Sequence, residues 1–203
     1  MLRVLVTGFE PFNNAKLNPS ESLVTKLHHD DVPGAEIITK VLPVVYSKSA
    51  EQLLALIQEH QPDLVLCFGQ AEGRKEISIE RFAVNLDDAG IADNAGAKRV
   101  DQKIQQDGPA AFLSTLPVRE LVLALKEKNI PAAQSLSAGS FVCNHIFYEM
   151  QHAMAGTSVK SGFIHVPLMT EQQEDFPGLF TMPIDQMVLA AKTIIATLVA
   201  SSN

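Results

Sequence analysis

The hydrophobic and polar positions along this chain follow two alternating patterns, which predict strands that alternate with helices. Short apolar runs such as Asp63–Phe68 indicate strands buried on both faces, and apolar residues three or four apart, as in Ser47–His60, indicate amphipathic helices. Asn18 directly before Pro19 is typical of a helix start, because asparagine caps the helix and proline fits its first turn. We expect strands at Leu2–Thr7, Glu36–Leu42, Asp63–Phe68, Ile77–Leu86, Ala132–Leu136 and Phe163–Val166, and helices from Pro19 onward and at Ser47–His60, Pro117–Lys128, Phe141–Met154 and Pro183–Ala200.

This order of elements predicts an α/β fold, in which a parallel or mostly parallel sheet is covered by helices on both faces. No repeat, linker or low-complexity tract divides the chain, so residues 1–203 are expected to form a single domain. The polar stretch Asp87–Pro109 predicts a long loop, and loops of this length are usually functional. Sites in such folds gather at the carboxyl ends of strands, where Gly69, Ser137 and His165 lie.

The composition fits a globular protein and disfavours several classes of function. Hydrophobic residues make up 46% and charged residues 19% of the chain, whose net charge is −7. A nucleic-acid partner would need a basic patch, and a membrane span would need about 18 apolar residues in a row; the sequence has neither. Two cysteines cannot form a disulfide framework, and the first residues do not follow the pattern of a signal peptide. We therefore expect a cytoplasmic chain with no nucleic-acid or membrane partner.

Cys143 is the first candidate for chemistry, in the segment 137–145, which reads SAGSFVCNH. Small residues precede the cysteine and an apolar helical pattern follows it, so its sulfur should lie near a helix N-terminus. The helix dipole and free N–H groups would lower the pKa of the thiol there and could hold an oxyanion. The alternative is a buried, inert thiol, which is the usual state of a free cysteine. Cys67, inside an unbroken apolar run, is expected to be of that inert kind.

A cysteine nucleophile needs a base, and His165 is the strongest candidate among the six histidines. It lies near the end of an apolar strand, whereas His145 should face away from Cys143 because it follows by only two residues. A hydrogen-bonded core histidine is an equally good interpretation of His165 from local sequence. Glu80 interrupts an apolar alternation and could orient such a base, although an ion pair with Arg74 or Arg81 is the simpler reading.

Other chemistries find no support in the sequence. Metal-ligand spacings such as Cys-x-x-Cys and His-x-x-x-His are absent, and so are the glycine-rich loops that bind nucleotides. The segment 6–12, which reads VTGFEPF, follows the first strand. Its Phe9 and Phe12 could form an apolar pocket wall or ordinary core packing.

Together these segments resemble one family. The resemblance extends from about Leu2 to the last helix and is carried by VTGFEPF at 6–12, NPS at 18–20, GQAEGR at 69–74, IERFAVN at 79–85, SAGSFVCNH at 137–145 and GFIHVP at 162–167. The sequence is similar to pyroglutamyl peptidase I (pyrrolidone-carboxylate peptidase), a family of cytosolic cysteine exopeptidases. The resemblance implies a three-layer α/β/α sandwich, a catalytic triad of Glu80, Cys143 and His165, no metal or other cofactor, and assembly into dimers or tetramers.

The implied substrates are peptides whose N-terminus is a pyroglutamyl lactam. This group has no charged amine, so its pocket should be apolar with a few hydrogen-bonding groups. The implied pocket walls are Phe9, Phe12, Phe141 and Val142, and backbone groups of Asn18 and Gln70 would meet the lactam.

One position departs from the family pattern. The family usually reads Asp-Ala-Arg-Ile-Pro-Asp-Asn where residues 88–94 read DAGIADN, so Gly90 replaces an arginine implied to help the oxyanion. Loss of one oxyanion donor can slow an enzyme by about 10²- to 10³-fold. The alternative hypothesis is therefore a catalytically weak or silent homologue that binds blocked peptide ends. A different hydrolase or phosphorylase on the same sandwich is a second alternative, which would show no preference for the lactam.

Overall fold

A computed structural model describes residues 1–202 and has a six-stranded central sheet in the order β2-β1-β3-β8-β4-β7. The predicted α/β class with a mostly parallel sheet is confirmed. The strands of this sheet are β1 (Leu2–Phe9), β2 (Ala35–Leu42), β3 (Leu64–Gln70), β4 (Ile77–Glu80), β7 (Ala132–Ser135) and β8 (Lys160–Val166). The helices are α1 (Pro19–Leu27), α2 (Tyr46–His60), α3 (Val118–Glu127), α4 (Val142–Met154) and α5 (Ile184–Ala200).

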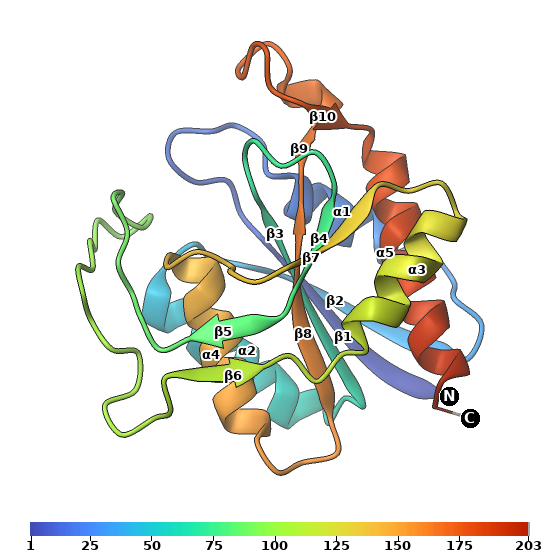
Figure 1. Cartoon of the computed structure of the whole chain (residues 1–203), viewed down its shortest axis with the longest axis horizontal. Coiled ribbons are helices and arrows are strands. Elements are labelled where there is room, and N and C mark those ends of the chain that lie inside the picture. The colour runs from blue at the N-terminus through green and yellow to red at the C-terminus, as the bar shows by residue number, and fades with distance from the viewer. Residues whose placement is uncertain (203) are drawn as a thin grey trace.

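The sheet is the middle of three layers, because its strands are apolar on both faces. In β1, Val4 and Val6 belong to a core with α1, α3 and α5, while Leu5 belongs to a second core with α2 and α4. Figure 1 shows α3 and α5 on one side of the sheet and α2 and α4 on the other. Within residues 1–202, no helix combines the length and the apolar character needed to cross a membrane.

One strand pairing reverses the direction of the sheet. Strands β2, β1, β3 and β8 are parallel to one another, but β4 pairs with β8 in antiparallel fashion, and β7 is parallel to β4. Ser78 of β4 lies opposite His165 of β8. Glu80, two residues further along β4, projects from the same face as Ser78, so its side chain is a diagonal neighbour of His165.

Some short elements differ from the predicted boundaries. The expected strand Ile77–Leu86 is divided at Arg81 into β4 and β5 (Phe82–Val84), and β5 forms a separate antiparallel ribbon with β6 (Ala111–Leu113). A second ribbon joins β9 (Leu168–Met169) to β10 (Thr181–Met182), with a short 3₁₀ helix, η1 (Thr170–Gln172), between them. Strands β5, β6, β9 and β10 and the helix η1 have two or three residues each, which is too short for a periodic pattern to reveal.

The start of α1 is attached to the end of β1, as the Asn18-Pro19 pair predicts. Asn18 Oδ1 accepts hydrogen bonds from the Ser20 amide at 3.0 Å and the Ser20 hydroxyl at 2.8 Å, which caps the helix. The Ser20 Oγ in turn accepts the Phe9 amide at 3.0 Å, and Asn18 Nδ2 donates to the Glu10 carbonyl at 3.0 Å. These bonds fix where Phe9 lies at the carboxyl end of β1.

Candidate active site

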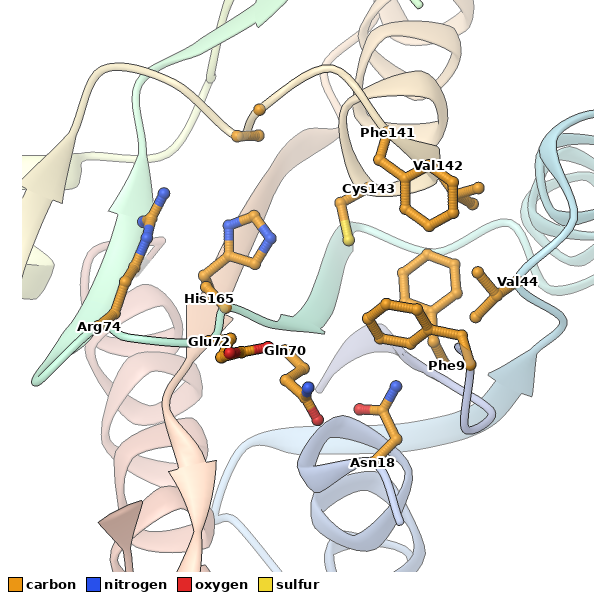
Figure 2. Close-up of a pocket in the computed structure, with 14 residues that line it drawn as sticks. Phe9, Asn18, Val44, Gln70, Glu72, Arg74, Phe141, Val142, Cys143 and His165 are labelled. Carbon is orange, nitrogen blue, oxygen red and sulfur yellow. The ribbon is translucent and has the colours of Figure 1, made fainter. Parts of the chain in front are cut away.

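A cavity of about 290 Å³ opens at the carboxyl ends of β1, β3 and β8. Figure 2 shows the Cys143 side chain, from the start of α4, and the His165 ring, from the end of β8, pointing into it. All six residues that were expected to bind substrate line the same cavity. The complete lining is Phe9, Phe12, Asn18, Val44, Gln70, Ala71, Glu72, Arg74, Ala138, Gly139, Phe141, Val142, Cys143 and His165.

Cys143 is the second residue of α4, as its sequence context predicts. The helix begins without a side-chain cap, and its first backbone hydrogen bond is donated by His145 to the Phe141 carbonyl. The amides of Val142, Cys143 and Asn144 precede that bond, so they have no acceptor within the helix and can face an anion. This geometry supplies backbone donors next to the Cys143 sulfur.

Gly69 allows the sulfur to approach the sheet next to His165. It is the Cα partner of His165 in the β3–β8 pairing. A Cβ atom at Gly69 would lie 2.9 Å from the Cys143 sulfur and 2.8 Å from the Phe163 ring, closer than real contacts allow. The sulfur therefore lies directly against the backbone that pairs with His165, where only glycine leaves room for it.

His165 is held from behind by Glu80. The distance from His165 Nδ1 to Glu80 Oε1 is 2.7 Å, the Glu80 side chain is fully buried, and His165 is 4% exposed. Because an ionised carboxylate only accepts hydrogen bonds, the Nδ1 atom carries the proton and Nε2 is the atom free to accept one. Arg74 Nη1 donates to the same Glu80 oxygen at 2.7 Å. The sequence left open whether Glu80 orients His165 or pairs with an arginine, and in the structure it does both.

Burial favours the neutral forms of both Cys143 and His165. Burial raises the pKa of the Cys143 thiol to about 12, and the negative charge of Glu80 adds to the rise. Burial also lowers the pKa of His165 below its usual value of 6.5, although Glu80 opposes this. The predicted lowering of the thiol pKa is therefore wrong, because burial and the charge of Glu80 raise it.

The neutral pair predicts a specific pH dependence. His165 must be uncharged to accept a proton, and its lowered pKa means that it loses this ability only as the pH falls below 6.5. We expect kcat/KM to be level from pH 7.5 to 9.0, with no thiolate absorbance appearing over that interval. Ultraviolet titration of the wild type against Cys143→Ala checks this. A thiolate step from Cys143 inside that interval would contradict the neutral-pair description.

Cys67 and the remaining histidines lie outside the cavity. Cys67 is fully buried with its sulfur 3.8 Å from that of Met150, and burial raises the pKa of its thiol to about 12. The His145 ring faces away from Cys143, and its Nδ1 lies 2.9 Å from Asp87 Oδ2. In the part of the chain that the structure describes, no cluster of three or more His, Cys, Asp or Glu residues could hold a metal ion.

The walls of the cavity include three aromatic rings, those of Phe9, Phe12 and Phe141, and both backbone and side-chain polar groups reach it. The Phe12 and Phe141 rings are 6.0 Å apart, and Phe141 also packs edge-on against Tyr46. The side chain of Asn18 is engaged at both ends by its capping bonds, so a ligand would meet its backbone. The pairing of β3 with β1 ends at Cys67, whereas β3 continues to Gln70. The last residues of β3 therefore have backbone N–H and C=O groups on the β1 side that no strand pairs.

The long loop from Asp87 to Pro109 supports one wall of the cavity. Asn94 donates from its side chain to Glu10 Oε1 at 2.8 Å and from its backbone to the Val44 carbonyl at 2.9 Å. Glu10 Oε1 also accepts the Val44 amide at 3.1 Å. The loop therefore fixes Val44, a wall residue that the sequence analysis missed because its position depends on contacts distant in sequence.

Gly90 lies on the exposed surface of this loop. A Cβ atom there would meet no atom within 4 Å, so a larger side chain has room. Its neighbour Asp88 exchanges hydrogen bonds with Ser140, in the segment leading to α4. The loop therefore contacts the segment that leads into α4, but Gly90 itself has no side chain that could reach Cys143.

A thiol at a helix start, an imidazole at a strand end and a buried carboxylate behind it are the groups that a cysteine hydrolase uses. The sequence profile of the pyroglutamyl peptidase family matches residues 2–201. The pyrrolidone-carboxylate peptidases of Erwinia tasmaniensis and Cupriavidus pinatubonensis are each 44% identical to this chain, over 97% and 99% of it and 92% and 94% of their own lengths. This chain belongs to the pyroglutamyl peptidase family.

Solved structures agree with this assignment. Pyroglutamyl peptidase I from Bacillus amyloliquefaciens has a TM-score of 0.94 with this chain at 38% identity, over 98% of both chains. A mutant pyrrolidone carboxyl peptidase from Pyrococcus furiosus has a TM-score of 0.95 at 39% identity, over 100% of both chains. The resemblance inferred from the motifs and the α/β/α sandwich that it implied are both confirmed.

Proposed function

We propose that this chain is a cysteine exopeptidase that removes pyroglutamyl groups from peptide N-termini, with Cys143 as nucleophile, His165 as base and Glu80 as its orienting partner. The observation that carries the proposal is one cavity that holds Cys143, His165 and an aromatic wall together. Family membership supplies the reaction, and the geometry supports the assignment of roles to residues.

The first half of the reaction forms a thioester. His165 Nε2 takes the proton from the Cys143 sulfur as the sulfur attacks the pyroglutamyl carbonyl. The carbonyl oxygen becomes an oxyanion, which the first amides of α4 stabilise. The imidazolium, stabilised by Glu80, then gives its proton to the departing peptide nitrogen as the carbon–nitrogen bond breaks.

The second half releases the pyroglutamyl group. A water molecule attacks the thioester carbonyl while His165 accepts one of its protons. The carbon–sulfur bond breaks, pyroglutamate leaves, and the proton returns from His165 to the sulfur. Both groups end in the neutral state that their pKa shifts favour, so each cycle restores the starting enzyme.

Selectivity follows from the apolar character of the cavity. The lactam ring is neutral and can lie between Phe9, Phe12 and Phe141, with its polar atoms on the backbone groups of Asn18 and Gln70. An uncyclised glutamate would bring an ammonium and a carboxylate into the same space without partners for both. Because such groups lose their hydration, their entry is strongly disfavoured.

The test is a comparison of chromogenic amides that differ only in the first residue. We expect kcat/KM for the pyroglutamyl amide to exceed that for the glutamyl amide by about 10³-fold or more, and alkylation of the protein to remove the activity. The prolyl amide, which has the ring but an ammonium and no lactam carbonyl, is the matched control. Equal hydrolysis of the three amides would refute the proposed substrate class.

The silent homologue suggested by Gly90 makes a different prediction in the same assay. It would bind the pyroglutamyl amide in a saturable way without releasing product. The backbone donors at the start of α4 do not depend on residue 90, Cys143 and His165 line the same cavity, and Glu80 is hydrogen-bonded to His165. These observations favour turnover over binding alone.

Finer expectations about the whole protein also belong to the proposal. The site draws on residues from Phe9 to His165, which supports one catalytic domain over residues 1–203, of which Asn203 lies outside the described residues. Association into dimers or tetramers, which the resemblance implies, is part of the same proposal. Two free thiols support a reducing, cytoplasmic setting.

A further inference from the structure

We propose that Arg74 is a positioning residue that holds the Glu80 carboxylate against His165 and ties the loop before α4 to the same carboxylate. The inference rests on the proposed function and extends it to a residue outside the triad. Arg74 follows β3 in the segment that leads to β4, and it lines the cavity. In the view of Figure 2, the His165 ring lies between Arg74 and Cys143.

The first contact of Arg74 fixes Glu80. Arg74 Nη1 and His165 Nδ1 each lie 2.7 Å from the same oxygen, Glu80 Oε1. The other carboxylate oxygen, Oε2, is buried and finds no hydrogen-bond partner among residues 1–202. Rotation of the carboxylate is therefore opposed by the two bonds on Oε1 alone. Without Arg74, only the bond to His165 would hold the group that orients the base.

The second contact of Arg74 reaches the other half of the site. Its Nη2 atom donates to the Ser137 carbonyl at 3.0 Å, in the segment between β7 and α4. Ala138 and Gly139, which follow directly, line the cavity, and α4 with Cys143 begins three residues later. One planar guanidinium thus bridges the carboxylate behind the base and the segment that leads to the nucleophile, which a single ammonium could not do with the same geometry.

Arg74 also contributes charge to the surroundings of His165. The titratable and charged groups near the ring are Glu80 from β4, Cys143 from α4, and Arg74 and Glu72 from the segment between β3 and β4. The positive charge of Arg74 lowers the pKa of His165 and opposes the effect of Glu80. Removal of this charge should therefore move the acid limit of activity to higher pH, whereas Arg74→Lys, which keeps the charge, should not move it.

The experiment compares Arg74→Gln, Arg74→Lys and the control Lys75→Gln, which removes the neighbouring, exposed charge. For Arg74→Gln we expect kcat on the pyroglutamyl amide to fall about 10- to 100-fold, because the base is no longer held in place. The acid limb of its profile of kcat against pH, where activity falls as His165 becomes protonated, should move to higher pH by up to about one unit. Arg74→Lys should keep the wild-type acid limb but recover only part of kcat, and Lys75→Gln should match the wild type.

A second readout does not depend on turnover. The proton of the His165 Nδ1 bond to Glu80 gives a downfield NMR signal, which should broaden or shift in Arg74→Gln and persist in Lys75→Gln. Wild-type kcat, acid limb and NMR signal in Arg74→Gln would overturn the proposal for Arg74. An inactive wild type would instead overturn the proposed function, and the NMR comparison would still decide the role of Arg74.

Discussion

Cys143→Ser is expected to lower kcat on the pyroglutamyl amide by about 10⁴- to 10⁶-fold. The substitution keeps a side chain of similar shape at the start of α4 but replaces the thiol by a hydroxyl, which is a much weaker acid. The neutral His165 imidazole removes a proton from a thiol far more readily than from a hydroxyl, whose pKa is much higher. Steady-state release of the chromogenic amine measures the effect.

The matched control is the same change at the other cysteine. Cys67 is fully buried on β3, and its sulfur contacts Met150 rather than the cavity. Cys67→Ser should therefore cost some thermal stability and leave kcat close to the wild-type value. Loss of activity in the folded Cys67→Ser protein, together with activity in Cys143→Ser, would show that the nucleophile has been assigned to the wrong thiol.

Glu80→Gln is expected to have the second largest effect, a fall in kcat of about 10²- to 10⁴-fold. The amide can donate a hydrogen bond to His165 Nδ1, which favours the tautomer whose Nε2 carries the proton and cannot accept one from Cys143. The amide also fails to stabilise the imidazolium formed during attack. Because both effects act on the chemical step, KM should change little, and a full kinetic analysis separates the two constants.

Glu76→Gln is the control for this substitution. Glu76 is an exposed carboxylate directly before β4, so its replacement removes the same charge without touching His165. Circular dichroism should show that both variants fold, since the amide occupies nearly the same volume as the carboxylate. A folded Glu80→Gln protein with wild-type kcat would remove Glu80 from the mechanism.

The sequence was sufficient to predict the layers of the fold and to nominate the reacting groups. Cys143 and His165 stood out because each is a reactive side chain at the edge of a strongly apolar element, where strand and helix periodicity is clear. Asn18 and Pro19 predicted the start of α1 correctly because capping is a local effect. Glu80 remained ambiguous from local sequence, since periodicity does not reveal that β4 pairs with β8 in the opposite direction.

What could not be predicted depends on contacts between distant parts of the chain. Val44 lies in a connecting segment without a periodic pattern, and its position is set by Asn94 and Glu10. The sequence suggested Arg74 as a partner of Glu80, but not its place in the cavity or its bond to the Ser137 carbonyl. The pKa of Cys143 was predicted in the wrong direction because the helix end is visible in the sequence, whereas burial of the sulfur arises only from the folded structure.

The most direct test of the account is to trap the acylated enzyme. A pyroglutamyl ester, whose acylation is fast, is mixed with the wild type, quenched in acid within the first turnovers and digested for peptide mapping by mass spectrometry. The account predicts a pyroglutamyl group on the peptide that contains Cys143 and none on the peptide that contains Cys67. Acylation at any other residue, or substrate turnover by a protein in which Cys143 stays unmodified throughout, would contradict it.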